Sequence, residues 1–125
     1  SGLLERPLLA LWRQSIELAI KAAIVELAGG IAGNPGHDLR KLFGQLLEIR
    51  MQEGCCDDDD LTHEVVDMIA HVQSFDPKAD RFRYPADRSG TRYMGLSVDL
   101  DALFRAHWII TTWCEGAVLE LRGDV

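Results

Sequence analysis

Apolar residues recur at helical spacing over two long stretches of the chain, and this periodicity constrains the fold more than any other feature. After Pro7, which suits a first helical turn, the inward positions are Leu8, Leu11, Trp12, Ile16, Ala19, Ile20, Ala23, Ile24 and Leu27. From Ser97 or Asp99 to Leu121 they are Leu100, Leu103, Phe104, His107, Ile110, Cys114, Ala117, Val118 and Leu121. Intervals of three and four predict helices with one broad face against a core.

A second, shorter helix is expected after a turn. Gly29 and Gly30 end the first helix, and residues 33–36 (Gly-Asn-Pro-Gly) are typical of a turn. Asp38 then stands where an acid favours the positive end of a helix. This helix carries its apolar residues at helical spacing and is predicted to stop near Gly54.

A third helix begins near Thr62 and ends before Pro77. Between it and the last helix, residues 81–94 contain two short alternating runs around a turn-rich stretch, which predicts a hairpin or an irregular loop. The expected fold is therefore all-α: one domain over residues 1–125, an antiparallel four-helix bundle with a short irregular or hairpin insertion before the last helix. The broad apolar faces of the first and last helices also predict a homodimer.

Composition narrows the function classes. Twenty acids against thirteen Lys and Arg give a net charge of −7, so any nucleic-acid binding must be local. Three cysteines make a poor disulfide framework, which favours a reducing cytoplasm. We expect no membrane helix, because the most apolar stretch carries charges, and no cofactor or metal ion, because the sequence lacks a phosphate-binding glycine loop and metal-ligand spacing.

Two segments carry a family resemblance: Gln14–Ala22 in the first helix, and the Gly-His-Asp-Leu start of the second in Gly36–Phe43. Together they resemble HEPN-like helical domains of prokaryotic toxin, defence and nucleotide-related proteins, and the Phe82–Pro85 loop resembles them more weakly. The resemblance implies a helical, dimeric module with a nucleotidyltransferase-like or other protein partner. The chain departs from the ribonuclease signature Arg-x(4-6)-His, because no Arg here has a His at that distance.

Candidate binding residues begin with a stripe on the first helix. Arg13, Glu17 and Lys21 fall four residues apart, so a carboxylate lies between two cations on one side of the helix. Ordinary pairing on the helix surface explains this spacing. The alternative, which the resemblance favours, is a binding groove across which Glu17 and Lys21 face His37 and residues 81–92. His37 itself either caps the second helix or acts in binding.

Arginines and aromatics gather before the last helix. The candidate binding residues there are Arg81, Arg83, Tyr84, Arg88 and Arg92. Arginines beside aromatic rings bind phosphate and stack on bases, which predicts contact with a nucleotide or RNA. Alternatively, the aromatic side chains hold the loop to the bundle while the arginines pair with acids at 57–60.

Two functions remain open from the sequence. The first is a non-catalytic helical module that supports a partner protein and binds nucleotide or RNA. The second is a ribonuclease of a toxin or defence system whose rearranged site uses His107, Arg105, Arg83 and His37, with a His as acid or base and an Arg stabilising charge. Because His107 follows Arg105 by two residues, the two side chains point to different sides of a helix.

Overall fold

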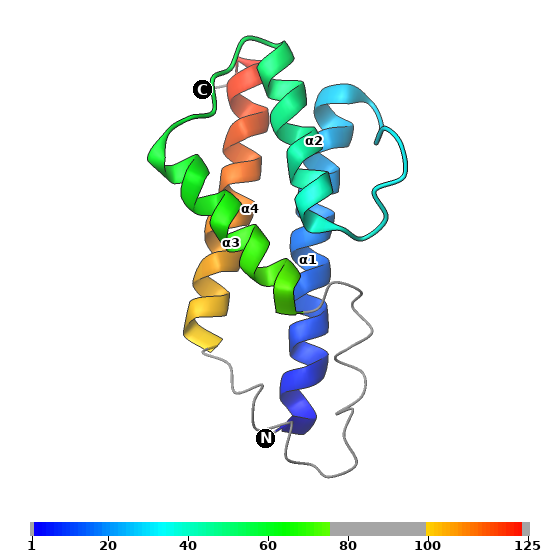
Figure 1. The fold of residues 1–125 in the computed structure, drawn as a ribbon, viewed down its shortest axis with the longest axis vertical. Coiled ribbons are helices and arrows are strands. Elements are labelled where there is room, and N and C mark those ends of the chain that lie inside the picture. The colour runs from blue at the N-terminus through cyan, green and yellow to red at the C-terminus, as the bar shows by residue number, and fades with distance from the viewer. Residues whose placement is uncertain (1, 76–99, 124–125) are drawn as a thin grey trace.

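Four helices pack into a bundle in the computed structural model, which describes residues 2–75 and 100–123 (Figure 1). They are α1 (Gly2–Ala28), α2 (Leu39–Gln52), α3 (Asp60–Phe75) and α4 (Leu100–Arg122). The all-α bundle is confirmed. Within the described part of the chain, no helix is long and apolar enough to cross a membrane. The expected hairpin or loop at residues 81–94 lies outside the described residues.

The helix boundaries follow the sequence signals closely, with two differences. α1 begins at Gly2, so Pro7 lies inside the helix and not in its first turn. Proline removes one backbone donor, and this close to the N-terminus few hydrogen bonds are lost. α3 begins at Asp60 because the Asp59 carboxylate accepts hydrogen bonds from the Thr62 backbone N–H (3.2 Å) and hydroxyl (2.7 Å).

The direction of the helices departs from the expected antiparallel order. α3 runs opposite to α2 and α4, but α1, α2 and α4 run in the same direction (Figure 1). Contacts between α1 and α4 advance together along both helices: Trp12 Nε1 donates to the Leu103 carbonyl (2.7 Å), and Arg122 pairs with Glu26 (3.3 Å). Because α1 and α2 also run in the same direction, the antiparallel expectation is wrong for this pair of consecutive helices. It holds for α2 with α3 and for α3 with α4.

The connection at residues 29–38 accounts for this reversal. A chain of this length spans up to about 30 Å, whereas α2 is roughly 20 Å long, so the connection can run back beside α2. Gln45 on α2 holds it in place, because its side-chain amide bonds both the N–H (2.8 Å) and the carbonyl (3.0 Å) of Ala32. Gly33 and Gly36 adopt positive φ in this segment, a conformation that glycine adopts without strain.

The core lies where all four helices meet. It contains aliphatic and aromatic side chains from every helix: Leu9, Trp12, Ile16, Ile20, Ala23, Ile24, Leu39, Leu42, Phe43, Leu46, Val65, Ile69, Val72, Leu103, Ile110, Cys114 and Val118. Phe104, expected on the inward face of α4, is instead exposed. Leu8 and Leu11 on α1 are also exposed, so the inward face of each long helix is narrower than the sequence pattern predicted.

A buried arginine, Arg50, joins the C-terminal ends of α2 and α4. Arg50 donates to both carboxylate oxygens of Asp57 (2.9 Å each), to the Ala117 carbonyl (2.8 Å) and to Glu120 (2.7 Å). Its guanidinium also lies 5.3 Å from the Trp113 ring. The hydrogen bonds to Asp57 outweigh the opposing effect of burial and raise the pKa of Arg50, so this side chain stays charged while it joins α2, the connector and α4.

Two adjacent valines test the assignment of the core. Val65 is fully buried, whereas Val66 is 40% exposed. Val65→Ala should lower the free energy of unfolding by about 1–3 kcal/mol through lost packing, and Val66→Ala should change it by less than about 0.5 kcal/mol. Both replacements change helix propensity equally, so denaturant unfolding of the pair isolates the burial term. Equal losses would contradict the orientation of α3.

Candidate functional site

Glu17 occupies the centre of a polar cluster between α1 and the start of α2. One carboxylate oxygen accepts hydrogen bonds from Lys21 Nζ (2.9 Å) and lies 2.8 Å from His37 Nδ1, and the other lies 3.4 Å from Arg13 Nη1. Glu17 and Arg13 are buried, with 6% and 2% exposed, whereas the His37 side chain is 69% exposed. The structure thus brings together the three candidate binding residues of this region, Glu17, Lys21 and His37.

Arg13 connects this cluster to α3. Its Nη2 donates to the His37 carbonyl (2.8 Å) and to Gln73 Oε1 (3.0 Å), and the same Gln73 oxygen accepts from the Leu39 backbone N–H (2.9 Å). Arg13 Nε is buried and has no hydrogen-bond partner among the described residues. Burial of a guanidinium is costly unless it is hydrogen-bonded, so these contacts fix α1, α2 and α3 relative to one another.

The start of α2 is capped by Asp38 and not by His37. The Asp38 carboxylate accepts from the backbone N–H groups of Arg40 (3.0 Å) and Lys41 (3.1 Å), as expected for an N-cap residue. Gly36 precedes with φ of 63°, which turns the chain so that His37 meets Glu17. His37 is therefore held by its side chain, on the carboxylate, and by its carbonyl, on Arg13.

The electrostatics of the cluster favour an ionised Glu17. Burial alone raises the pKa of Glu17, but hydrogen bonds from Lys21 and His37, together with their charges, outweigh burial and lower it. An ionised carboxylate accepts the Nδ1 proton of His37, which leaves Nε2 of the exposed ring directed away from this bond. The Nε2 edge of this imidazole can contact a ligand from solvent, with Lys21 adding positive charge nearby.

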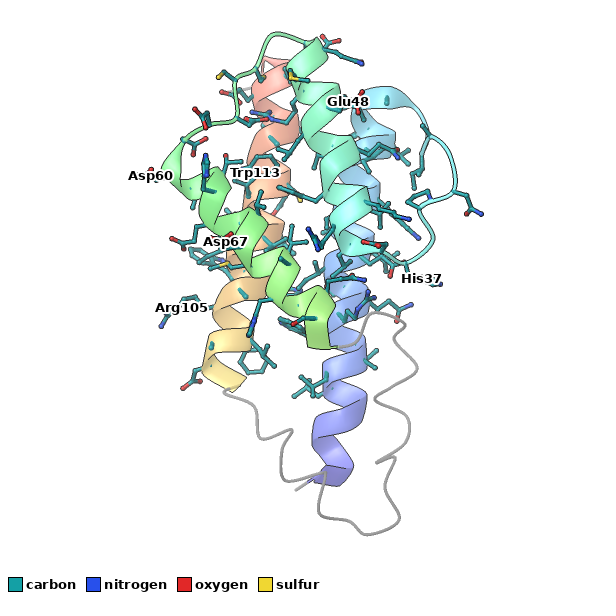
Figure 2. All side chains as sticks on the ribbon, viewed as in Figure 1. His37, Glu48, Asp60, Asp67, Arg105 and Trp113 are labelled. Carbon is teal, nitrogen blue, oxygen red and sulfur yellow. The ribbon has the colours of Figure 1, made fainter. Side chains whose placement is uncertain are left out.

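The residues of the alternative nuclease site are not brought together in the described part of the chain. His107 Nε2 lies 2.8 Å from Ser15 Oγ, whereas His37 bonds Glu17, two residues further along α1. Positions two apart point to opposite sides of a helix, so α1 separates the two histidines. Figure 2 shows Arg105 on the far side of the bundle from His37.

Five candidate binding residues lie outside the described residues: Arg81, Arg83, Tyr84, Arg88 and Arg92. The arginines among them were expected to pair with the acids at 57–60. In the described structure these acids have partners of their own: Asp57 binds Arg50, Asp58 lies 2.9 Å from His63 Nε2, and Asp59 caps α3. No group of three or more His, Cys, Asp or Glu side chains is arranged to hold a metal ion among residues 2–75 and 100–123.

Sequence reasoning missed two parts of this arrangement. Gln73 on α3 bonds both Arg13 and Leu39, the first residue of α2. It lies far from both in the sequence, so no local pattern predicts these contacts. The Ser15–His107 hydrogen bond joins α1 to α4, and its one sequence signal was His107 at an inward position of the predicted last helix. No protein-family model, curated protein or solved structure matches this chain.

Replacing Glu17 by Gln tests the role of this carboxylate in stability. The variant should lower the free energy of unfolding at neutral pH by about 3 kcal/mol, because it leaves the buried Arg13 without its carboxylate. The lowered pKa fixes the pH dependence. Stability from the ionised Glu17 is complete above the unfolded value near 4.5 and is lost as the pH falls through the folded pKa.

Urea unfolding at a series of pH values measures both effects. The difference between the wild-type protein and Glu17→Gln should shrink steadily as the pH falls below about 4.5. Glu48→Gln, at an exposed position of α2, is the control and should show no comparable loss at neutral pH. A difference that stays constant down to acid pH would mean that Glu17 is not ionised in the folded protein.

Proposed function

We propose that this chain is a non-catalytic HEPN-like helical module that forms a homodimer through one apolar face, supports a partner protein, and binds nucleotide or RNA near His37. The observation that carries the proposal is a stripe of exposed residues on α1. Leu8, Leu11, Leu18, Ala22 and Val25 are exposed at intervals of three, four and seven residues. Ser15 holds the remaining position of this spacing, but it is half-buried and bonds His107 on α4. The pattern is the heptad spacing of a helix that packs against another helix.

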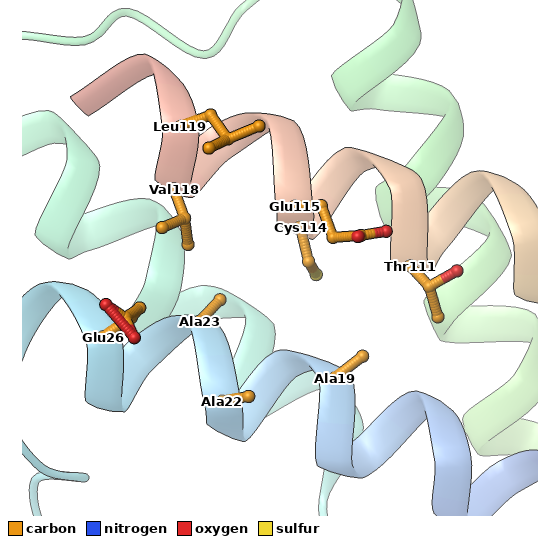
Figure 3. Close-up of a pocket in the computed structure, with 9 residues that line it drawn as sticks. All are labelled: Ala19, Ala22, Ala23, Glu26, Thr111, Cys114, Glu115, Val118 and Leu119. Carbon is orange, nitrogen blue, oxygen red and sulfur yellow. The ribbon is translucent and has the colours of Figure 1, made fainter. Parts of the chain in front are cut away.

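α4 extends the same face. A hollow of about 370 Å³ lies between α1 and α4 on one side of the bundle, and small side chains of α1 form one wall of it (Figure 3). Ala22 lines this hollow, and Leu8 and Ser15 precede Ala22 by whole heptads, so they lie on the same side of α1. On α4, Phe104 and Trp108 precede the lining residues Thr111 and Glu115 by one heptad.

We call this surface the outer α1/α4 face, made by Leu8, Leu11, Leu18, Val25, Phe104, Trp108 and Leu119. Seven of the ten large exposed hydrophobic side chains in the described part of the chain belong to it. Concentrated exposed apolar surface marks an interaction site. A second copy is the proposed occupant, because two heptad stripes of identical sequence pack against each other around a twofold axis and cover the same residues on both chains.

Introducing a negative charge at one leucine tests the dimer. Leu18 is 56% exposed at the middle of the α1 stripe, and Leu61 is 49% exposed on α3, away from it. Light scattering after size exclusion should give twice the mass of one chain for the wild-type protein and for Leu61→Glu, and one chain for Leu18→Glu. A buried, unpaired carboxylate in the interface costs several kcal/mol, enough to weaken dimerisation by about 100-fold or more.

The dimer proposal fails if the wild-type protein has the mass of one chain at micromolar concentration. It also fails if Leu18→Glu and Leu61→Glu dissociate equally, since the effect would then come from added charge and not from the face. Circular dichroism of both variants establishes that their helices are intact.

Binding of nucleotide or RNA is the second part of the proposal, and the exposed His37 ring supports it. The ring is held by Glu17 at Nδ1 and stands beside Lys21 at the start of α2. A phosphate can contact the Lys21 ammonium by charge-assisted hydrogen bonds, with the exposed His37 ring beside it. Because the chain is acidic overall, this binding depends on a local group of cations, and the arginines of residues 81–92 are proposed to contribute to it.

A pair of exposed histidines tests this site. Fluorescence anisotropy with a labelled single-stranded RNA, and with a labelled ATP analogue, should show about tenfold weaker binding for His37→Ala, as expected for the loss of one hydrogen-bonded contact. His63→Ala removes a histidine of similar exposure on α3 and should leave the affinity unchanged. Equal affinity in all three proteins would remove His37 from the site, while leaving the dimer proposal intact.

The partner protein follows from the family resemblance alone. A nucleotidyltransferase-like protein is the proposed partner. The ribonuclease alternative is tested separately with the same protein preparations, by measuring RNA cleavage in the presence of chelator. Cleavage by the wild-type protein that is lost in His107→Ala would support it.

A further inference from the structure

Three sulfur-containing side chains border one hollow at the end of α2. Met51 lies in the last turn of the helix, and Cys55 and Cys56 follow in the connector to α3. All three line a cavity of about 520 Å³, together with Gly44, Leu47, Glu48, Asp57 and Asp58. Met51 and Cys56 are exposed, Cys55 is partly buried, and both thiols are free. The hollow is therefore accessible from solvent and bordered by thiol and thioether groups.

Hydrogen bonds fix the backbone on both sides of the cysteine pair. The Cys55 N–H donates to the Arg50 carbonyl (2.9 Å), and the Asp58 N–H donates to the Cys56 carbonyl (2.9 Å). The Asp57 carboxylate, next along the chain, is held by two hydrogen bonds from the buried Arg50. Folding has thus already ordered the segment that carries the two thiols, which lowers the entropy cost of binding a ligand there.

The donor set distinguishes between metal ions. Among residues 2–75 and 100–123 there is no group of three or more His, Cys, Asp or Glu side chains arranged for a metal, so the four-ligand set of a zinc site is not formed there. Two thiols with a thioether are soft ligands, which select Cu(I). Glu48 and Asp58 at the same hollow carry negative charge, whereas the Arg50 guanidinium, which binds Asp57, interacts with Cys55 from the core side.

We propose that Cys55, Cys56 and Met51 form a binding site for a soft monovalent cation of the Cu(I) type. Binding forms two bonds from thiolate sulfur to the ion and one contact from the thioether. Each thiol gives its proton to solvent, and neither the sulfur atoms nor the ion change oxidation state.

Competition with a chromophoric Cu(I) chelator under anaerobic conditions tests the site on the full chain. The wild-type protein should withdraw one Cu(I) per chain from the chelator. The double variant Cys55→Ser/Cys56→Ser should bind at least about 100-fold more weakly, and Met51→Leu about tenfold more weakly, since each loses direct ligands. Circular dichroism checks that the variants keep their helices.

Cys114 supplies the control. Its thiol is buried in the core, and burial raises its pKa to about 12, so Cys114→Ala should leave Cu(I) binding unchanged. The proposal is overturned if the wild-type protein withdraws no Cu(I), or if the double serine variant keeps the wild-type affinity. Unchanged affinity in Met51→Leu would contradict the thioether ligand and with it the three-sulfur site.

Discussion

Burial of the Arg13 guanidinium is the constraint on which one half of the bundle depends. A guanidinium carries its charge at any physiological pH, so it enters a core only where acceptors surround it. Glu17, the His37 carbonyl and Gln73 provide these acceptors from α1, the α1–α2 connection and α3. The position of His37, and therefore of the candidate binding cluster, follows from the need to satisfy this one side chain.

Local signals predicted the four helices well, but they did not predict that α1 and α2 run in the same direction. The periodicity around Ile16 and Ile110 placed α1 and α4, and Asp38 was correctly placed at the start of α2. The direction of a helix depends on how the preceding connection folds over the surface. The two hydrogen bonds between Gln45 and Ala32 that hold residues 29–38 against α2 correspond to no periodic pattern in the sequence. The parallel course of α1 and α2 therefore required the structure.

The candidate site divides in the same way. Spacing along one helix correctly grouped Glu17 with Lys21, because four residues make one turn. The family resemblance, and not the spacing, joined His37 to them. Gln73 and the buried Arg50 were missed, since each acts through partners far away in the sequence, and a lone Gln or Arg in a helix normally lies at the surface.

The shared direction of α1, α2 and α4 gives the molecule an electrical axis. Each helix carries partial positive charge at its N-terminal end and partial negative charge at its C-terminal end, and three of these dipoles add while α3 opposes them (Figure 1). Arg50 lies where the carboxyl ends of α2 and α4 meet, and it donates to the Ala117 carbonyl. His37 precedes the opposite end of α2. An approaching anion thus meets a bundle whose two ends differ in potential, although the net charge of the chain is negative.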